Sequence, residues 1–428
     1  MLDQVGAFEG KNKVDIRACT VAAADGDLAR LQMFRARGFR WNGRTAEAAA
    51  LYGHRHIVEW LHETGAFRDS TAMMEGAARG GHIDLLVWLH DTGGYEINRH
   101  LYVSAAGANQ KHVIQWARAR AGCRNHRVCA EAAKNGHLEL MRWLRGKGFR
   151  WNDIVCTNAA ASGHLHVLEW ALDNGCSLNA RVASAAAGGG HLAILQWLRQ
   201  RGCPWKKSVC ARAAGGGHLH VIMWATANGC PWGGKVFLRA AAGGHMDVIR
   251  WANANNANGA VTMHAGEMCA LAASGGHLPV VQSLSGHILF GYANMEAQAA
   301  RGGHVHILRW LRDHGHLLRT PCASSMAALR GDLPLLKWFV GNRWPWHDDV
   351  CAHAAERGSL EMIKWARANS CPWGEHACSF AALGGHLNVL KWLRANGCPW
   401  NARVIAHARE GNHHEMVEWA MANGCPKE

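Results

Sequence analysis

The sequence has 428 residues, of which 49% are hydrophobic and 18% are charged, and its formal net charge is +14. This composition excludes an intrinsically disordered chain. No apolar run reaches the roughly 18 residues that a membrane-spanning helix needs, so we expect no membrane contact. The abundance of His (29), Trp (21) and Gly (49) is unusual, and any interpretation of the chain has to explain it.

Residues 1–16 come before the first repeated segment and are expected to form an N-terminal extension. They lack the basic start and the apolar core of a secretory signal. The 15 cysteines, an odd number, are therefore expected to be free thiols in a reducing compartment. We accordingly expect an intracellular, cytoplasmic location, and the nucleus remains an alternative.

After this extension the chain repeats one phrase, which begins with Gly136-His137-Leu138 and continues Glu-Leu-Met-Arg-Trp-Leu. The phrase returns, with variations, at Gly163 and at Gly385. We call its first residue the anchor of a repeat. The 15 anchors lie at positions 26, 53, 81, 109, 136, 163, 190, 217, 244, 276, 303, 331, 358, 385 and 412. Successive anchors are 27 or 28 residues apart, except for one gap of 32.

The abundant residue types occupy fixed places relative to the anchor. Thirteen Trp lie seven residues after it, seven more lie fifteen after it, and eleven His follow it directly. Seven Cys lie seven residues before the anchor and six lie thirteen after it. Residues that resemble a metal-binding or catalytic set are therefore predicted to be one structural formula used many times.

Residues 128–152 show what one repeat must contain. An Ala-rich first stretch favours a short helix whose small side chains allow close packing. Gly136 ends this helix, because Gly and sometimes Asn adopt the left-handed conformation at low cost, which also explains the anchors Asn109 and Asn412. A second helix with an apolar stripe follows and ends at Gly148. The pattern predicts a helix–turn–helix that must stack on its neighbours, and hence an all-α solenoid.

The residue after the anchor is predicted to start the second helix. Asp27, Asp332 and Ser359 replace His at this position, and Asp and Ser are good N-cap residues. We therefore expect the recurring His to have a capping or turn role. The Trp residues at helical spacing are expected to lie in the core.

The repeats resemble those of the ankyrin-repeat family over nearly the whole chain. Residues 381–401 read Ala-Ala-Leu-Gly-Gly-His-Leu-Asn-Val-Leu-Lys-Trp-Leu-Arg-Ala-Asn-Gly-Cys-Pro-Trp-Asn, close to the family pattern Ala-Ala-x-x-Gly-His-Leu-Glu-Val-Val-x-x-Leu-Leu-x-x-Gly-Ala-Asp-Val-Asn. The Thr-Pro-Leu-His opening of the family is absent, and the period is shorter than the usual length of about 33 residues. We expect about 15 stacked ankyrin-like repeats with shortened loops that lack β-hairpin fingers. The short period looks most like the ankyrin proteins of amoeba-infecting giant viruses, and the location would then be host cytoplasm.

The repeats fall into two groups along the chain. Residues 17–252 are assigned to repeats 1–9 and residues 267–428 to repeats 10–15, the last of which is polar and resembles a C-terminal cap. Between them, residues 253–266 contain a turn-rich insertion that we interpret as a bulged loop and a possible hinge. A simple tolerated insertion is the alternative.

Resemblance to ankyrin proteins implies that a partner binds the concave face, through exposed positions of the first helix. These positions do not repeat from unit to unit, whereas the framework positions do, although a variable surface can also arise by drift. The candidate partner-binding residues are Glu131, Lys134, Asn158, Arg212, Arg239, Gln298, Arg301, His353, Arg357 and Phe380.

Catalytic and metal-binding motifs are absent from the sequence. Residues 229–235 have the spacing of a phosphate loop, but Val236 stands where Ser or Thr is required. No His-Glu-x-x-His and no Cys-x-x-Cys occurs, and equivalent Cys or His of neighbouring repeats should be about 10 Å apart, too far to share a zinc ion. We expect no enzyme activity, no metal site and no cofactor.

The sequence therefore predicts a non-enzymatic, monomeric scaffold for protein–protein interaction. The net charge of +14 leaves a second hypothesis open, a basic solenoid that binds nucleic acid or another polyanion. Its Arg residues are dispersed over the outer helices and do not form a basic tail, so the protein partner is the leading interpretation.

Overall fold

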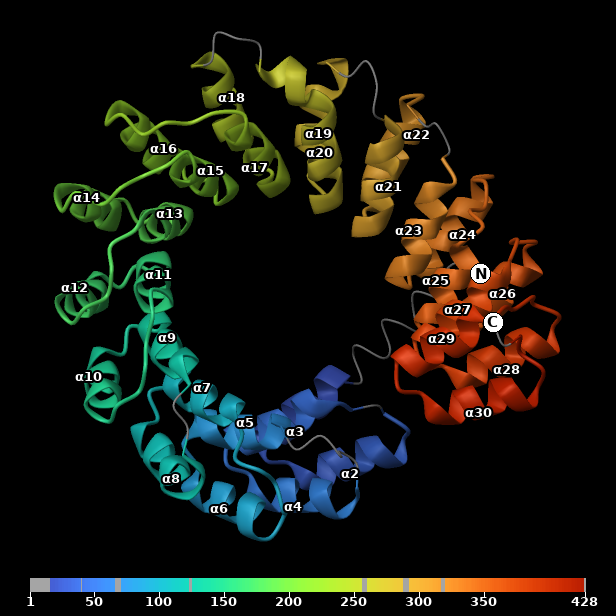
Figure 1. Cartoon of the computed structure of the whole chain (residues 1–428), viewed down its shortest axis with the longest axis horizontal. Coiled ribbons are helices and arrows are strands. Elements are labelled where there is room, and N and C mark those ends of the chain that lie inside the picture. Colours follow the sequence, from blue (N-terminus) through green and yellow to red (C-terminus); the bar gives the residue numbers. More distant parts are fainter. Residues whose placement is uncertain are drawn as a thin grey trace. The chain divides into compact units, whose positions relative to one another are not determined.

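A computed structural model describes residues 16–39, 41–65, 71–122, 125–255, 260–287, 292–316 and 320–426. These residues form α-helices joined by turns and short loops, with one short 3-10 helix, η1 (Ser285–His287), and no strand among them (Figure 1). The prediction of an all-α repeat solenoid without β-hairpin fingers is confirmed. Residues 1–15, most of the expected N-terminal extension, lie outside the described residues.

Each repeat contributes a first helix before its anchor and a second helix after it. The first helices after residues 16–25 are α3 (Gly43–Leu51), α5 (Thr71–Gly80), α7 (Arg99–Gly107), α9 (His126–Lys134), α11 (Ile154–Ala161), α13 (Ala180–Gly188), α15 (Ser208–Gly215), α17 (Lys235–Gly243), α19 (Ala260–Gly275), α21 (Tyr292–Gly302), α23 (Cys322–Arg330), α25 (Val350–Glu356), α27 (Glu375–Leu383) and α29 (Arg403–Glu410). The second helices are α2 (Leu28–Ala36), α4 (Arg55–Glu63), α6 (Ile83–Asp91), α8 (Lys111–Ala121), α10 (Leu138–Gly146), α12 (Leu165–Asp173), α14 (Leu192–Gln200), α16 (Leu219–Ala227), α18 (Met246–Ala254), α20 (Leu278–Leu284), α22 (Val305–Asp313), α24 (Leu333–Gly341), α26 (Leu360–Ala368), α28 (Leu387–Ala395) and α30 (His414–Ala422).

The chain divides into two compact units. The first comprises residues 1–213 and 220–231, and the second comprises residues 214–219 and 232–428. This division does not coincide with the insertion at residues 253–266. Residues 260–266, which the sequence placed in a loop, form the start of α19, because no Pro and no Gly interrupts the segment before Gly266. Residues 256–259 lie outside the described part, and the hinge stays a prediction.

The core of each unit lies between the helices of consecutive repeats. First helices pack directly on the first helices of their neighbours, as α3 does on α5 and α25 on α27, and second helices pack on the first helix of their own repeat, as α12 does on α11. Fully buried Ala residues such as Ala132 and Ala133 on α9 allow this close approach. The second helix contributes two or three buried residues per repeat, in α10 Leu140, Met141 and Leu144.

The Trp residues of the second helices do not belong to this core. Trp60, Trp143 and Trp197 are half-buried, so the prediction that these indoles lie in the core is wrong. Where the preceding repeat has a loop Trp, the two indoles contact each other, as where the ring centroids of Trp41 and Trp60, and of Trp151 and Trp170, lie 5.2 Å apart. Helical spacing identifies the face on which a side chain lies but not its depth, and a large indole at the rim stays partly exposed.

The turn at the anchor has the conformation that the sequence predicts. The described anchors have positive φ, including the two that are not glycine, Asn109 (61°) and Asn412 (57°). The anchor carbonyl and the residues before it are then placed against the next repeat. Glycine meets a second requirement here, because a Cβ on Gly163 would lie 2.7 Å from the His191 ring of the following repeat.

The recurring His after the anchor occupies the N-cap position but does not cap its own helix. In α10 and α12, for example, His137 and His164 make no side-chain cap hydrogen bond. Instead Nε2 of His137 bonds the Gly107 carbonyl oxygen at 2.9 Å, and Nε2 of His164 bonds the Lys134 carbonyl oxygen at 3.0 Å. The acceptor in each case lies two residues before the anchor of the preceding repeat. The His is therefore a bond between repeats, whereas Asp27 does cap its helix.

Other residues make this inter-repeat bond where His is absent. Gln110 replaces His in repeat 4, and its Nε2 donates to the Arg79 carbonyl oxygen at 3.2 Å. In repeat 13 the position is Ser359, and Arg357 donates from Nη1 to the Leu329 carbonyl oxygen at 3.1 Å. What recurs in the framework is thus the hydrogen bond to this carbonyl oxygen, and His, Gln or Arg can donate it.

Candidate binding surface

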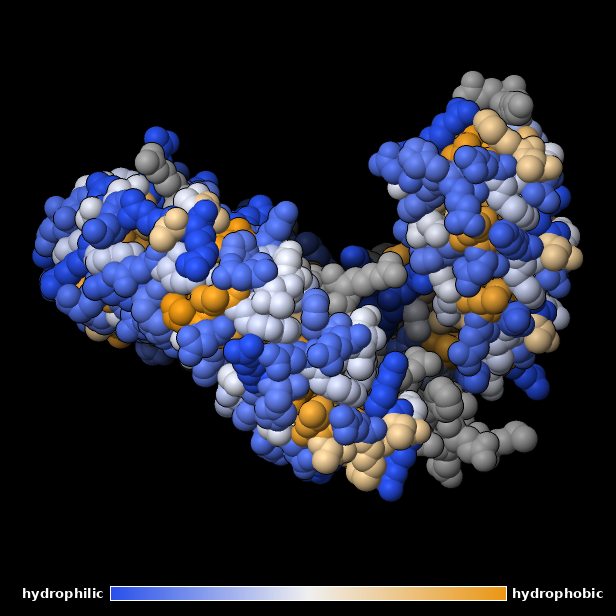
Figure 2. Space-filling model, turned by 90° about the horizontal axis from the view of Figure 1, so that it is seen from below, coloured by the Kyte–Doolittle hydropathy of each residue, from blue (hydrophilic) through white to orange (hydrophobic). Residues whose placement is uncertain are grey.

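The first helices of neighbouring repeats lie side by side, and their exposed sides together form a surface. In the first unit these helices line the inner side of the curve that Figure 1 shows, with the second helices outside. We call this surface the first-helix face. In the view of Figure 2 the molecular surface is mainly hydrophilic, with hydrophobic residues in small separate patches. Binding on such a surface depends on polar groups held in grooves between helices.

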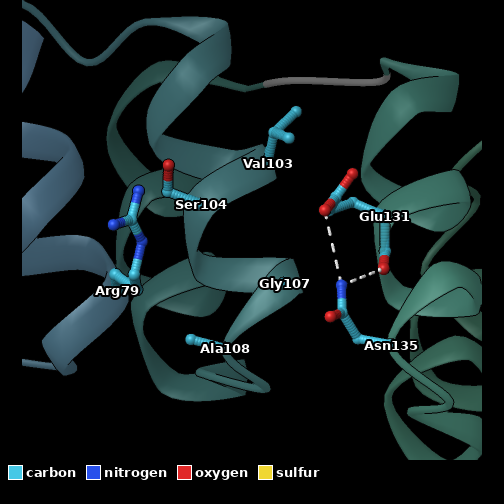
Figure 3. A pocket seen from close by; sticks show the side chains of 7 residues that line it. All are labelled: Arg79, Val103, Ser104, Gly107, Ala108, Glu131 and Asn135. Carbon is cyan, nitrogen blue, oxygen red and sulfur yellow. Dashed lines mark hydrogen bonds between the residues drawn. The ribbon is translucent and has the colours of Figure 1, made fainter. Parts of the chain in front are cut away.

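One groove, of about 450 Å³, lies across α5, α7 and α9 (Figure 3). Gly107 has no side chain and leaves its floor open, since a Cβ there would lie 3.3 Å from the Cγ of Glu131. The Glu131 carboxylate accepts hydrogen bonds from Lys134 Nζ at 3.2 Å and from Asn135 Nδ2 at 3.4 Å. Arg79 on the opposite wall is paired with Glu47 at 2.8 Å. We name this the repeat 3–5 groove; its charges are balanced.

A second groove, of about 510 Å³, crosses α11, α13 and the start of α15. We name it the repeat 6–8 groove. Its lining is made up of Asp153, Ile154, Thr157, Ala180, Arg181, Ser184, Ala185, Lys206, Ser208 and Arg212. It contains three cationic side chains and one carboxylate, so it is net positive if Lys and Arg are charged, as they are at neutral pH.

Local capping positions the residues of the repeat 6–8 groove. Asn179 is the N-cap of α13, and its Oδ1 accepts from the backbone N of Arg181 at 2.9 Å. Asp153 stands at the N-cap of α11 but makes no cap bond, and its carboxylate lies 3.5 Å from Nη1 of Arg181 instead. The side chain of Arg181 is 80% exposed, so this ion pair is weak and leaves the guanidinium available to a ligand.

Hydroxyl groups occupy the middle of the same groove. The Ser184 and Ser208 hydroxyls are 2.9 Å apart, and the Ser184 hydroxyl also donates to the Ala180 carbonyl oxygen at 2.7 Å. Thr157 donates to the Asp153 carbonyl oxygen at 2.9 Å. Because Ser184 and Thr157 donate their protons to backbone carbonyls, and Ser208 then donates to Ser184, these hydroxyls remain acceptors only. Oxygen atoms of a ligand would instead be bound by the cationic side chains of the groove, since charged donors make the stronger hydrogen bonds.

The structure separates the ten candidate residues predicted from sequence into different roles. Glu131 and Lys134 lie at the repeat 3–5 groove, and Arg212 lines the repeat 6–8 groove. Asn158 is half-buried and donates to the Ala130 carbonyl oxygen at 3.1 Å, so it links α11 to α9. Arg357 makes the inter-repeat bond described above.

The remaining candidates lie in the second unit. Arg239 and Arg301 are exposed, and Gln298 is half-buried. His353 and Phe380 contact each other, with ring centroids 5.9 Å apart, and Nδ1 of His353 lies 3.6 Å from the Glu356 carboxylate. These two rings form a small half-buried aromatic pair between α25 and α27.

Sequence reasoning missed Arg181, Lys206, Ser184 and Ser208. They lie at three different offsets, nine residues before the anchor for Arg181 and Ser208, six for Ser184 and eleven for Lys206, so comparison of one offset across all repeats does not bring them together. The available signal lay in the first-helix segments of three consecutive repeats, where Arg181, Lys206 and Arg212 are accompanied by only one acid, Asp153.

The described residues hold no group of three or more His, Cys, Asp or Glu arranged to bind a metal ion. No helix in the described ranges is long and apolar enough to cross a membrane. Burial lowers the pKa of His164 and of His304, and the carbonyl hydrogen bond of each ring partly offsets this. These histidines belong to the inter-repeat framework.

Comparison with known proteins agrees with this architecture. A family model described as ankyrin repeats (many copies) matches residues 129–172, which include parts of α9 and α12 and all of α10 and α11. The match supports an ankyrin-repeat protein. No curated protein matches the chain.

Among solved structures, the chain is similar to helical-repeat proteins. One is the pentatricopeptide repeat protein PPR10 in complex with an 18-nt psaJ RNA element, at 11% identity and a TM-score of 0.33, covering 99% of this chain and 84% of that chain. Another is the same protein from maize, at 11% identity and a TM-score of 0.30, covering 95% and 73%.

Proposed function

We propose that this protein is a non-enzymatic scaffold that binds a partner protein through the first-helix face. The observation that supports it most is the contrast between positions. The framework repeats the same inter-repeat bond along the chain, whereas the two grooves on the first-helix face are lined by residues that differ from repeat to repeat. Because the groove residues differ while the helices that carry them are held in the same way, such a surface can be specific for one partner.

The framework also favours tight binding by holding the surface in place. Each inter-repeat hydrogen bond fixes one repeat against the next, and α13 in the middle of the repeat 6–8 groove is capped by Asn179. A partner that meets a preformed surface loses less conformational freedom on binding than one that has to order it.

The chemistry of the repeat 6–8 groove favours an acidic segment of the partner. The groove is lined by three cationic side chains, Lys206, Arg181 and Arg212, against a single carboxylate, Asp153. Aspartate or glutamate side chains of an extended peptide would pair with the guanidinium groups. The second candidate is a polyanion such as nucleic acid, which the net charge of +14 would attract without regard to the groove.

Selection of peptides from a random display library on the full-length protein tests this function. The groove variant carries Arg181→Glu and Arg212→Glu. The matched control carries Arg250→Glu and Arg309→Glu on second helices, where both side chains are exposed. Acidic peptides should bind the wild type and the control equally. They should lose at least about tenfold in affinity for the groove variant, because a paired cation becomes a like charge.

Two results would contradict the proposal. Equal loss in both double variants would mean that net charge, not the groove, attracts the peptides. Binding of a random single-stranded oligonucleotide at low salt that collapses at moderate salt, with no peptide selected at all, would favour the polyanion candidate.

A further inference from the structure

Four repeats place two cysteines in contact within the same repeat. One cysteine lies seven residues before the anchor, in the first helix, and the other lies thirteen after it, at the start of the following loop. The four pairs, each separated by 20 residues, are Cys156 and Cys176, Cys210 and Cys230, Cys351 and Cys371, and Cys378 and Cys398. The sequence led us to compare equivalent cysteines of neighbouring repeats, which hid this closeness inside one repeat.

The geometry confirms that the sulfur atoms meet. The sulfur atoms of Cys156 and Cys176 are in direct contact, close enough to be joined as a disulfide, whereas the sequence led us to expect independent free thiols. The sulfur atoms of Cys351 and Cys371 lie 3.7 Å apart, and both thiols are buried. The other two pairs are hydrogen-bonded thiols.

Other repeats carry only one of the two cysteines. Phe149 faces Cys129 at the matching position, and Ala183 faces Cys203. Burial raises the pKa of Cys129 to about 12, so this lone thiol stays protonated near neutral pH and is a poor nucleophile. A dithiol is therefore a feature of particular repeats and not of the repeat as such.

The Cys156–Cys176 pair differs from the other three in its loop. Cys176 is followed by Ser177 and Leu178, whereas each of the other three pairs has Pro and Trp after its second cysteine. Cys176 is half-buried, whereas Cys230 is 4% exposed and both Cys371 and Cys398 are 0% exposed. Of the four second cysteines, Cys176 is therefore the least buried and the one most open to a dissolved thiol or disulfide.

We propose that Cys156 and Cys176 form a reversible, redox-controlled cross-link, while the three pairs with Pro-Trp loops stay dithiols. The oxidant is a small disulfide such as oxidised glutathione. The Cys176 thiolate attacks one glutathione sulfur, breaks the S–S bond and releases one glutathione thiolate. The Cys156 thiolate then attacks Cys176 of this mixed disulfide and releases the second glutathione. Two thiol protons are lost to solvent, and the two electrons reside on the two reduced glutathiones.

One end of the cross-link lies on α11, a helix that lines the repeat 6–8 groove. Cys156 is fully buried on α11 between Ile154 and Thr157, both of which line that groove. Its partner Cys176 lies beyond α12, so the bond ties the two ends of repeat 6 together. Oxidation would restrict the unfolded chain and stabilise the repeat that supports the groove. The cross-link does not depend on the binding function proposed above.

The test uses the full-length protein equilibrated in glutathione buffers of increasing oxidised fraction. Samples are quenched with acid, alkylated under denaturing conditions and digested, and mass spectrometry quantifies each linked peptide pair. We expect the Cys156–Cys176 link to form at a lower oxidised fraction than any other and to disappear with excess dithiothreitol. The oxidised wild type should melt at a higher temperature than the reduced protein.

Three variants make the test specific. Cys176→Ser should abolish the link and the rise in melting temperature, whereas the matched Cys230→Ser should leave both unchanged. The double variant Ser177→Pro with Leu178→Trp copies the loop of the other three pairs and should slow cross-linking by about tenfold, because access controls the reactivity of a thiol. The absence of the link at full oxidation would overturn the proposal. Equal oxidation of all four pairs at one glutathione ratio, or a link seen only in denaturant, would do the same.

Discussion

Two regions of each repeat can be compared: the turn between its two helices, and the part of its first helix that lines a groove on the first-helix face. The residues of the two regions meet different requirements. At the turn, each backbone carbonyl two residues before an anchor needs a donor, and His, Gln or Arg supplies it. In the grooves, side chains such as Arg181 and Ser184 have no equivalent in most other repeats. The turns therefore carry stability and the grooves are left to vary, which makes the energetic difference between them measurable.

The largest effect is expected from Gly163→Ala. At this anchor φ is +84°, and a Cβ would lie 2.7 Å from the His191 ring. Gly175→Ala is the matched control, since its φ is +92° and nothing lies within 4 Å of a Cβ there. Left-handed backbone alone costs an L-residue about 1–2 kcal/mol. Urea unfolding should show that cost for Gly175→Ala and a clearly larger loss for Gly163→Ala, because the ring and its hydrogen bond must also move.

Equal losses in the two glycine variants would show that the His ring accommodates a methyl group freely. The contact between repeats would then be looser than the structure indicates. The double variant Gly163→Ala with His191→Ala separates the two contributions. Without the His191 ring the steric conflict is absent, so adding Gly163→Ala to His191→Ala should cost only the free energy of the left-handed backbone.

A smaller effect is expected when the donor of the inter-repeat bond is removed. Nε2 of His82 bonds the Leu51 carbonyl oxygen at 2.9 Å. His82→Ala leaves this partly buried carbonyl without its partner, and the expected loss of unfolding free energy is about 1 kcal/mol. His82→Gln should lose less, because Gln110 makes the same bond in the next repeat. Chemical denaturation of the three proteins side by side tests the ranking, and a Gln variant as unstable as the Ala variant would show that the ring itself matters.

These two positions also show how far the sequence could predict the structure. Gly and Asn at the anchors identified the left-handed turns, and the periodicity identified the helices, because both depend on local backbone preferences. The direction of His82 could not be read in the same way, since a period gives the position of a residue and not the neighbour that it meets. Nor could the repeat 6–8 groove, which Arg181 and Arg212 form only when three repeats stack.

A still smaller effect is expected from acidification. Burial lowers the pKa of His164 below its usual 6.5, so the unfolded chain binds a proton at higher pH than the folded protein does. Stability is therefore full above pH 6.5 and falls as the pH drops through the lowered folded value. His164→Gln can keep the bond to the Lys134 carbonyl but cannot titrate. Unfolding at pH 7.5 and 5.0 should show a smaller pH dependence for this variant, and an unchanged dependence would exclude His164 as a contributor.

The smallest stability effect is expected at Arg212, which was predicted from sequence on the same grounds as Arg357. Both lie near the end of a first helix, but Arg357 donates to the Leu329 carbonyl oxygen at 3.1 Å, whereas Arg212 lines a groove. Arg357→Ala should cost about 1 kcal/mol of unfolding free energy. Arg212→Ala should stay within about 0.5 kcal/mol of the wild type, as exposed substitutions do.

The same two variants should rank in the opposite order for binding of a groove-selected acidic peptide. Arg212→Ala removes a cation from the repeat 6–8 groove, while Arg357 lies on a different unit of the chain and leaves that groove intact. Calorimetry on both variants, with circular dichroism to verify folding, measures the two quantities on the same samples. If Arg212→Ala destabilised the protein as much as Arg357→Ala does, the division between supporting turns and binding grooves would not hold at this repeat.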